Sequence, residues 1–258
     1  MKPKITIEYL NSLGYADFVG LINQWNVLPG SYVTLSKWIN YGHIDEKSNI
    51  LQVACTTGFQ SREIALLTNC QGTAFDISKF AIKSAIYNKE EYAPNVKIEY
   101  LQCDGYKFNT KQKYSQKMKN KCVSLLKDGG YLLASPFYVI QRIPGELCKQ
   151  AKSIFGIDIT NNTYNEVMEL YNDLEIIYEC KNSIEIETPQ EIEKYCKYTV
   201  ERAKEILNIK DNDVINYIYN RLKTIRQMSN KLRPYQGYTV LVLRYRKNLY
   251  PKRYVELF

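Results

Sequence analysis

The 258-residue sequence contains a single histidine, His43, and no C-x-x-C pair among its seven cysteines. A structural zinc site is not expected, because such sites take four ligands from cysteine and histidine. An odd number of cysteines without paired spacing is typical of reduced thiols, so we expect a cytoplasmic protein. The sequence also lacks an apolar run long enough to span a bilayer, and its first residues show no secretory signal, so we expect no membrane partner.

Charge is unevenly distributed along the chain. Lysine and arginine outnumber aspartate and glutamate by 35 to 27, and residues 189–258 contain 15 basic and 7 acidic residues. This excess fits either a basic surface that attracts an anionic substrate or nucleic acid, or a solvated helical face. No basic run exceeds two residues, which favours the solvated face and makes a nucleic-acid partner unexpected.

Strands and helices are expected to alternate through the first half of the chain. Two helical stretches precede this alternation, at Thr6–Asn26 with a break at Gly14, and from Ser31 to Trp38. The alternating elements are strands at Asn49–Val53, Gly72–Phe75 and Val96–Leu101, and helices at Phe59–Thr68 and Ser78–Tyr92. Repeated strand–helix units predict an α/β fold with a doubly wound, mostly parallel sheet.

The second half of the chain is expected to be more helical. The predicted elements are helices at Tyr114–Leu126, Pro189–Leu207 and Asp211–Leu232, and strands at Tyr131–Phe137, Leu174–Lys181 and Tyr238–Arg246. We therefore expect four regions: N-terminal helices that cover the active site (1–42), an α/β core (43–188), a helical cap (189–236), and a final core strand with a tail (237–258).

Small residues form the turn after the first strand, in the sequence Ala54-Cys55-Thr56-Thr57-Gly58. Ligands of open α/β sheets bind outside the carboxyl ends of the strands, so this turn is the natural ligand position. The next strand ends at Asp76, whose carboxylate suits two ribose hydroxyls. The third strand leads to Asp104-Gly105, a second acidic position at the same edge, and a carboxylate there can accept a hydrogen bond from an adenine amino group.

Four segments, "ILQVACTTGFQSREIA", "GTAFDIS", "YLQCDGY" and "LLKDGGYLLAS", follow one another in an order that resembles the class I S-adenosylmethionine-dependent methyltransferases. The resemblance covers roughly Asn49–Pro136 and the final strand. It implies S-adenosylmethionine as cofactor, with its methionine portion against the loop Ala54–Gly58, its ribose at Asp76 and its adenine at Ile77 and Asp104. The implied cofactor-binding residues are Gln52, Ala54, Thr56, Gly58, Asp76, Ile77, Asp104 and Gly105.

Three positions depart from the family pattern. Gln52 replaces the usual acidic residue of the first strand and loses a charge that would attract the cofactor's ammonium group. Ala54 and Thr56 replace two loop glycines, and Thr56 narrows the loop. A dinucleotide-binding oxidoreductase is the nearest alternative on this fold, but its G-x-G-x-x-G pattern is absent, since the loop has one glycine.

The resemblance places the methyl acceptor among the N-terminal helices, the fourth and fifth strand ends and the cap. The implied acceptor-site residues are Tyr15, Trp25, Tyr32, Tyr138 and Arg142. Aromatic faces can hold a cationic acceptor, whereas Arg142 would pair with an acidic one. No catalytic base is assigned, because His43 precedes the first strand and should lie at the opposite edge of the sheet. We expect in-line methyl transfer to a small molecule; the alternatives are a non-catalytic cofactor-binding protein and a nucleic-acid methyltransferase.

The family has a further strand between the Asp104 landmark and the helix that leads to "LLKDGG". Only about ten residues, "YKFNTKQKYS", stand there in this sequence, which is too short for a strand, a loop and a helix. We therefore expect a strand to be missing beside Asn49–Val53, through residues skipped near Ser115–Gln116 or through a natural deletion.

Overall fold

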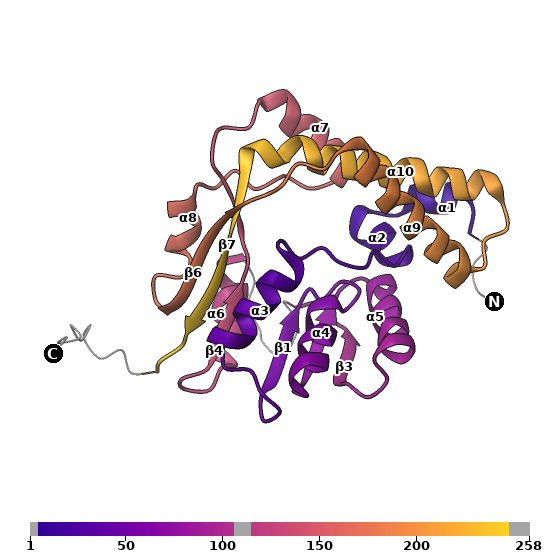
Figure 1. Cartoon of the computed structure of the whole chain (residues 1–258). Helices are drawn as coiled ribbons and strands as arrows, with labels where there is room; N and C mark the ends of the chain where they lie inside the picture. Colours follow the sequence, from indigo (N-terminus) through magenta and orange to yellow (C-terminus); the bar gives the residue numbers. More distant parts are fainter. Residues whose placement is uncertain (1–4, 106–114, 248–258) are drawn as a thin grey trace.

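The computed structural model describes residues 5–105 and 115–247, and Figure 1 shows its helices arranged around two sheets. The first sheet is parallel, with the order β1 (Asn49–Val53), β2 (Gln71–Asp76), β3 (Lys97–Gln102). Helices α4 (Phe59–Thr68) and α5 (Lys79–Tyr92) connect these strands. The predicted α/β fold with parallel strands is confirmed.

The three strands end at one edge of the sheet. Val53 of β1 pairs with Phe75 of β2, and Asp76 of β2 pairs with Gln102 of β3. The helix that follows β2 begins at this edge, where the Ser78 hydroxyl accepts a hydrogen bond from the backbone N–H of Ala81 and caps α5. Both predicted landmarks, the turn after β1 and the aspartate of β2, therefore lie at the same side of the molecule.

The second sheet is built around β7 (Gln236–Arg244), which is buried from Gly237 to Leu243. Strand β7 pairs antiparallel with each of the other strands of this sheet, namely β4 (Tyr131–Ala134), β5 (Phe137–Val139) and β6 (Glu175–Ser183). A strand with neighbours on both sides and both faces covered is expected to be a continuous apolar run, as "TVLVL" is.

Strands β1 and β4 are not paired with one another in the described parts of the chain: β1 pairs with β2, and β4 pairs with β7. In the described ranges, β1 therefore has a strand neighbour on one side only, namely β2. Leu51 on β1 is 39% exposed, which is unusual for a strand in the middle of an α/β fold. The segment 106–114, where the strand would begin, lies outside the described residues, so the expected skip near Ser115–Gln116 stays a prediction.

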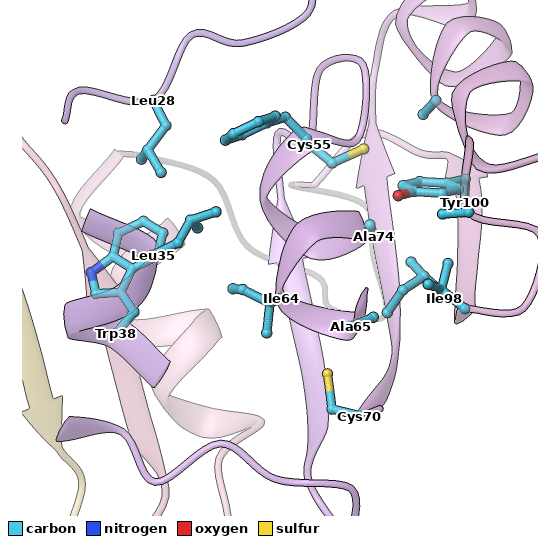
Figure 2. Close-up of a cluster of buried hydrophobic side chains, with 14 of the residues drawn as sticks. Leu28, Leu35, Trp38, Cys55, Ile64, Ala65, Cys70, Ala74, Ile98 and Tyr100 are labelled. Carbon is cyan, nitrogen blue, oxygen red and sulfur yellow. The ribbon is translucent and has the colours of Figure 1, made fainter. Parts of the chain in front are cut away.

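The main core lies between the parallel sheet, α4 and α3 (Ser31–Tyr41). Figure 2 shows Ile98 and Tyr100 of β3 and Ala74 of β2 on one side of α4, and Leu35 and Trp38 of α3 on the other side. These side chains belong to one buried cluster that continues into β7 through Tyr238, Val240 and Val242. Helix α3 therefore joins the two sheets through shared apolar contacts.

A second core lies between the N-terminal helices and the helices that precede β7. It is formed by α1 (Ile7–Ser12), α2 (Tyr15–Leu21), α9 (Pro189–Leu207) and α10 (Asn212–Leu232). Figure 1 shows α10 across the upper part of the molecule and α9 descending beside α2. The remaining elements are α6 (Ser115–Ser124), α7 (Gly145–Phe155), α8 (Tyr164–Glu169) and a 3₁₀ turn at Arg233–Tyr235. None of the helices in the described ranges could cross a membrane.

Candidate functional site

The loop after β1 alternates between ordinary and left-handed backbone conformations. Ala54, Thr56 and Gly58 have φ angles of 53°, 49° and 79°. Glycine adopts this region freely, whereas a β-branched residue such as Thr56 is strained there. At Gly58 a Cβ would also lie 2.7 Å from the hydroxyl oxygen of Tyr100. Both the φ angle and the close packing against Tyr100 therefore require glycine at position 58. Ala54 and Thr56 adopt the same left-handed region at a cost in conformational free energy.

Asp76 connects this loop to the end of β2. Its Oδ2 accepts a hydrogen bond from the backbone N–H of Thr56 (2.9 Å), and its Oδ1 accepts one from the N–H of Ser78 (2.9 Å). The residue is 8% exposed. A carboxylate has about four acceptor positions, so each oxygen retains capacity for one hydroxyl of a ligand.

Gln52 binds the first turn of α4 from the neighbouring strand. Its Oε1 accepts a hydrogen bond from the backbone N–H of Ser61 (3.0 Å), and its Nε2 donates one to Oε1 of Gln60 (2.9 Å). The first N–H groups of a helix have no partner within the helix, so Gln52 satisfies one of them. The amide at this position thus has a clear structural role beneath the loop.

The residues predicted to face the adenine lie together at the carboxyl edge. Cys103, which follows β3, donates its N–H to the carbonyl of Asp76 (2.9 Å) and so holds the ends of β2 and β3 together. Ile77 presents an apolar side chain that is 66% exposed, and Asp104 and Gly105 are half-buried. The structure therefore brings a carboxylate, an exposed apolar side chain and a second acidic residue to one edge.

Two buried groups next to the loop have raised pKa values. Burial raises the pKa of the Cys55 thiol, with the nearby Asp76 charge adding to the shift. Burial also raises the pKa of Tyr100 to about 12. Both groups are therefore protonated at neutral pH, so Cys55 is no thiolate nucleophile. No cluster of three metal-ligating side chains occurs among the residues that the structure describes.

Two of the predicted acceptor-site residues lie close to the loop and are connected by α4. The Tyr32 hydroxyl donates a hydrogen bond to Oε2 of Glu63 (3.0 Å), and Glu63 pairs with Arg62. The Arg62 guanidinium in turn lies over the Trp25 ring, 4.3 Å from its centroid. Trp25 and Tyr32 are thus joined through two residues that sequence reasoning did not select.

The other predicted acceptor-site residues lie in different surroundings. Tyr15 packs edge-on against Phe155, with ring centroids 5.4 Å apart. Tyr138 is buried on β5, where it covers Gly237. Arg142 is exposed and lines a cavity of about 520 Å³ beside α7. His43 is exposed in the loop before β1, at the opposite end of that strand from the loop Ala54–Gly58.

Arg62 is the residue that the sequence reasoning missed most clearly. An arginine in "QSREIALL" reads as a surface residue, yet Arg62 is fully buried. The spacing contained a signal, because Arg62 lies three residues from both Phe59 and Ala65, which are also buried. Residues three apart share a helix face, so Arg62 belongs to the inward side of α4.

Comparison with known proteins supports the fold. No family model and no curated protein matches the sequence. Among solved structures, the MccD protein has 21% identity and a TM-score of 0.67 over 86% of this chain and 100% of that chain. The phosphoethanolamine N-methyltransferase 2 of Haemonchus contortus, bound to phosphomonomethylethanolamine and S-adenosylhomocysteine, has 15% identity and a TM-score of 0.64. It matches over 95% of this chain, which spans 61% of that enzyme.

A third similar structure is the [4+2]-cyclase SpnF, with 12% identity and a TM-score of 0.59 over 90% of this chain and 93% of that chain. Further similar structures are S-adenosylmethionine-dependent methyltransferases in complex with S-adenosylhomocysteine. The chain therefore has the fold of the class I S-adenosylmethionine-dependent methyltransferases.

Proposed function

We propose that this protein binds S-adenosylmethionine and transfers its methyl group to a small-molecule acceptor. The observation that carries the proposal is the position of Asp76. Its carboxylate lies at the end of β2, fixes the loop after β1 through the Thr56 N–H, and retains acceptor positions for hydroxyl groups. On a methyltransferase fold, this is the combination that suits the ribose of the cofactor.

The surrounding residues fit the other parts of that cofactor. Ile77 offers an exposed apolar surface for the adenine, and Asp104 lies at the adjacent strand end, where a carboxylate accepts from an amino group. Ala54 is exposed and Thr56 half-buried, so these residues form the accessible side of the loop that would face the methionine portion. The side chains of Ala54 and Thr56 leave less space beside the loop than glycines would, and Gln52 provides no negative charge. We therefore expect the cofactor to bind more weakly than it would to a loop with glycines at these positions and an acidic residue in the strand.

When bound, the cofactor supplies a methyl group already activated on a sulfonium. The protein's own contribution is to hold the acceptor in line with that methyl group, and alignment accounts for most of the rate of such a transfer. A base is needed only where the acceptor must lose a proton. We assign none, because His43 lies at the far end of β1 and both Cys55 and Tyr100 hold their protons at neutral pH.

A small-molecule acceptor is supported by the helices α9 and α10, which share a buried core with α2 and with Phe80 of α5, the helix that follows Asp76. The Haemonchus contortus enzyme of the same fold is bound to the small molecule phosphomonomethylethanolamine. The cyclase SpnF shares the fold as well, so a reaction other than methyl transfer, or cofactor binding without catalysis, is the second candidate.

All seven cysteines are free, which supports a reducing, cytoplasmic location.

Calorimetry with S-adenosylhomocysteine tests the binding step. We expect Asp76→Ala and Asp76→Asn to weaken binding by about 1–3 kcal/mol through lost charge-assisted hydrogen bonds. The matched control is Asp158→Ala, because Asp158 is an exposed aspartate that pairs with Lys152 on the surface. Absence of binding to the wild-type protein, or binding indifferent to Asp76, would refute the proposal.

Turnover separates an enzyme from a binding protein. S-adenosylhomocysteine should accumulate when the protein and S-adenosylmethionine are supplied with a metabolite extract from which macromolecules have been removed. Purified RNA or DNA should give little product at physiological salt, because nonspecific binding through basic side chains fades steeply with salt. Product formed with nucleic acid and absent with the metabolite extract would identify a nucleic-acid methyltransferase instead.

A further inference from the structure

Arg62 holds an incompletely satisfied positive charge inside the protein. Its side chain is fully buried, and its Nε donates a hydrogen bond to Oε1 of Glu63 (3.0 Å). Nη2 lies 2.9 Å from the same oxygen, yet neither Nη1 nor Nη2 has a hydrogen-bond acceptor among the described residues. A guanidinium has five N–H donors, and buried donors without acceptors are costly. Arg62 therefore retains donors for an acceptor that the described part of the chain does not provide.

Arg202 of α9 brings a second cation to the same place. Its guanidinium carbon lies 5.4 Å from the centroid of the Trp25 ring, the ring that Arg62 also covers. Nη2 of Arg202 donates to the carbonyl of Asn23 (2.5 Å), whereas its buried Nε has no acceptor. No carboxylate forms an ion pair with Arg202 in the described ranges. Burial lowers the pKa of Arg202, and the nearby charge of Arg62 acts in the same direction.

Tyr195 adds a neutral donor to these two cations. It precedes Arg202 by seven residues on α9, which places both on one face of the helix. Burial raises the pKa of Tyr195, against the opposing effect of the Arg226 and Arg202 charges, so its hydroxyl is protonated at neutral pH. The group of Arg62, Arg202 and Tyr195, here called the Trp25 cluster, thus contains two cations and one hydroxyl. Glu63 pairs with Arg62, and the ion pair of Arg226 with Glu187 adjoins the Tyr195 ring.

The Trp25 cluster adjoins the proposed cofactor loop. The Thr57 hydroxyl donates to the carbonyl of Gln24 (2.6 Å) and lies 3.4 Å from that of Trp25. Trp25 and Arg202 are half-buried, so part of the cluster lies at the protein surface, although its unsatisfied donors are buried. Because guanidinium groups already cover the indole ring, the ring is poorly suited to a cationic acceptor. Arginine, by contrast, binds carboxylates and phosphates through two parallel hydrogen bonds.

We propose that the Trp25 cluster binds an oxyanion, a carboxylate or a phosphate, carried by the methyl acceptor. This inference rests on the proposed function, because it places the acceptor's acidic group beside the loop that would hold the cofactor. It specifies the acceptor class as anionic. It also assigns the unsatisfied donors of Arg62 and Arg202 a chemical role.

Inorganic phosphate is the probe. It is titrated calorimetrically into protein saturated with S-adenosylhomocysteine, at constant ionic strength set by chloride, and acetate is titrated separately to represent a carboxylate. We expect at least one of the two anions to bind, and Arg202→Gln and Arg62→Lys each to weaken that binding about tenfold or more. The control Arg246→Gln removes an exposed arginine that pairs with Glu175 and should leave anion binding unchanged. Binding of S-adenosylhomocysteine to each variant verifies that it is folded.

The outcomes separate this inference from the proposed function. Two results would overturn the inference and leave the proposed function standing. In the first, the wild-type protein binds S-adenosylhomocysteine but neither anion. In the second, the Arg202 and Arg62 variants bind the anions as well as the wild-type protein does. Arg202→Gln that weakens S-adenosylhomocysteine and spares the anions also overturns it, because the cluster would then serve the cofactor. If the wild-type protein binds no S-adenosylhomocysteine, the proposed function is refuted. If that protein nevertheless binds an anion, and Arg202→Gln abolishes this binding, the result would support an anion site.

Discussion

Asn23 and Asn88 form a closed pair of hydrogen bonds between their side-chain amides. Nδ2 of Asn23 donates to Oδ1 of Asn88 (2.7 Å), and Nδ2 of Asn88 donates to Oδ1 of Asn23 (2.8 Å). Both residues are fully buried, and Nδ2 of Asn88 also donates to the carbonyl of Thr57 (3.1 Å). The pair therefore joins the segment after α2, helix α5 and the loop proposed to bind the cofactor.

Breaking this pair should destabilise the protein. Asn88→Ala leaves the buried Asn23 amide and the Thr57 carbonyl without their partners, and we expect a loss of about 2–3 kcal/mol in the free energy of unfolding. Urea denaturation measures it, with Asn95→Ala as the control because Asn95 is exposed in a turn. Equal unfolding midpoints for the two variants would show that the amide pair contributes no net stability.

Replacing Thr56 by glycine should stabilise the folded protein. Thr56 has a φ of 49°, a region in which a non-glycine residue is strained by about 1–2 kcal/mol, while glycine loses somewhat more backbone entropy on folding. We expect a net gain of up to about 1 kcal/mol, measured as a higher urea midpoint. The opposite change, Gly58→Ala, should destabilise, since its new Cβ would meet Tyr100. A loss of stability in Thr56→Gly would mean that the threonine side chain compensates for the strain.

Restoring an acidic residue in β1 should strengthen cofactor binding. In Gln52→Glu, the carboxylate can still accept from the Ser61 N–H, and a negative charge near the first turn of α4 is favourable. It would also attract the ammonium group of S-adenosylmethionine. We expect a higher affinity at low salt that decreases as salt screens the charge. Gln60→Glu is the matched control on α4, and an equal effect from it would indicate a general charge effect.

The Tyr100 hydroxyl should make stability depend on alkaline pH. Its pKa is about 12 in the folded protein because of burial, whereas an unfolded tyrosine titrates near 10. The folded state therefore binds this proton more tightly than the unfolded state does. The resulting contribution to the free energy of unfolding is fully present below pH 10 and is lost as the pH rises through 12. Tyr100→Phe removes this loss together with the hydrogen bond to the Gly58 carbonyl.

We expect Tyr100→Phe to be less stable than wild type by about 1 kcal/mol at pH 7, with the difference shrinking above pH 10. Urea unfolding at pH 7, 9, 10 and 11 measures it, because the other tyrosines are common to both proteins. A difference that stays constant up to pH 11 would contradict the assigned pKa.

Local sequence signals predicted the elements of the parallel half closely. Strand β1 and helix α4 have the predicted bounds, and Ser78 caps α5 as its residue type indicates. Helix α9 also has the predicted bounds, beginning at Pro189 after the N-cap residue Thr188. Glycine, proline and capping residues act over a few neighbouring positions, so their effects can be read from the sequence without knowledge of the tertiary fold.

The site was harder to predict, because its geometry depends on contacts distant in sequence. The landmarks Asp76 and Ile77 lie at the expected edge, but the left-handed conformations of Ala54 and Thr56 have no signal in residue type. Arg62 and Arg202 come together over Trp25 only when α9 packs against the segment after α2. Residues 140 positions apart in a chain leave no periodic pattern that would associate them.

The pairing of β7 has a consequence for synthesis on the ribosome. In the parts of the chain that the structure describes, every strand pair of the second sheet includes β7 (Gln236–Arg244), which follows β4, β5 and β6 in sequence. Strands β4, β5 and β6 therefore emerge from the ribosome without any partner, while β1, β2 and β3 can pair as soon as they are made. The nascent protein exposes the apolar residues of these three strands until β7 has been made and has left the exit tunnel, which makes that interval a period of risk for aggregation.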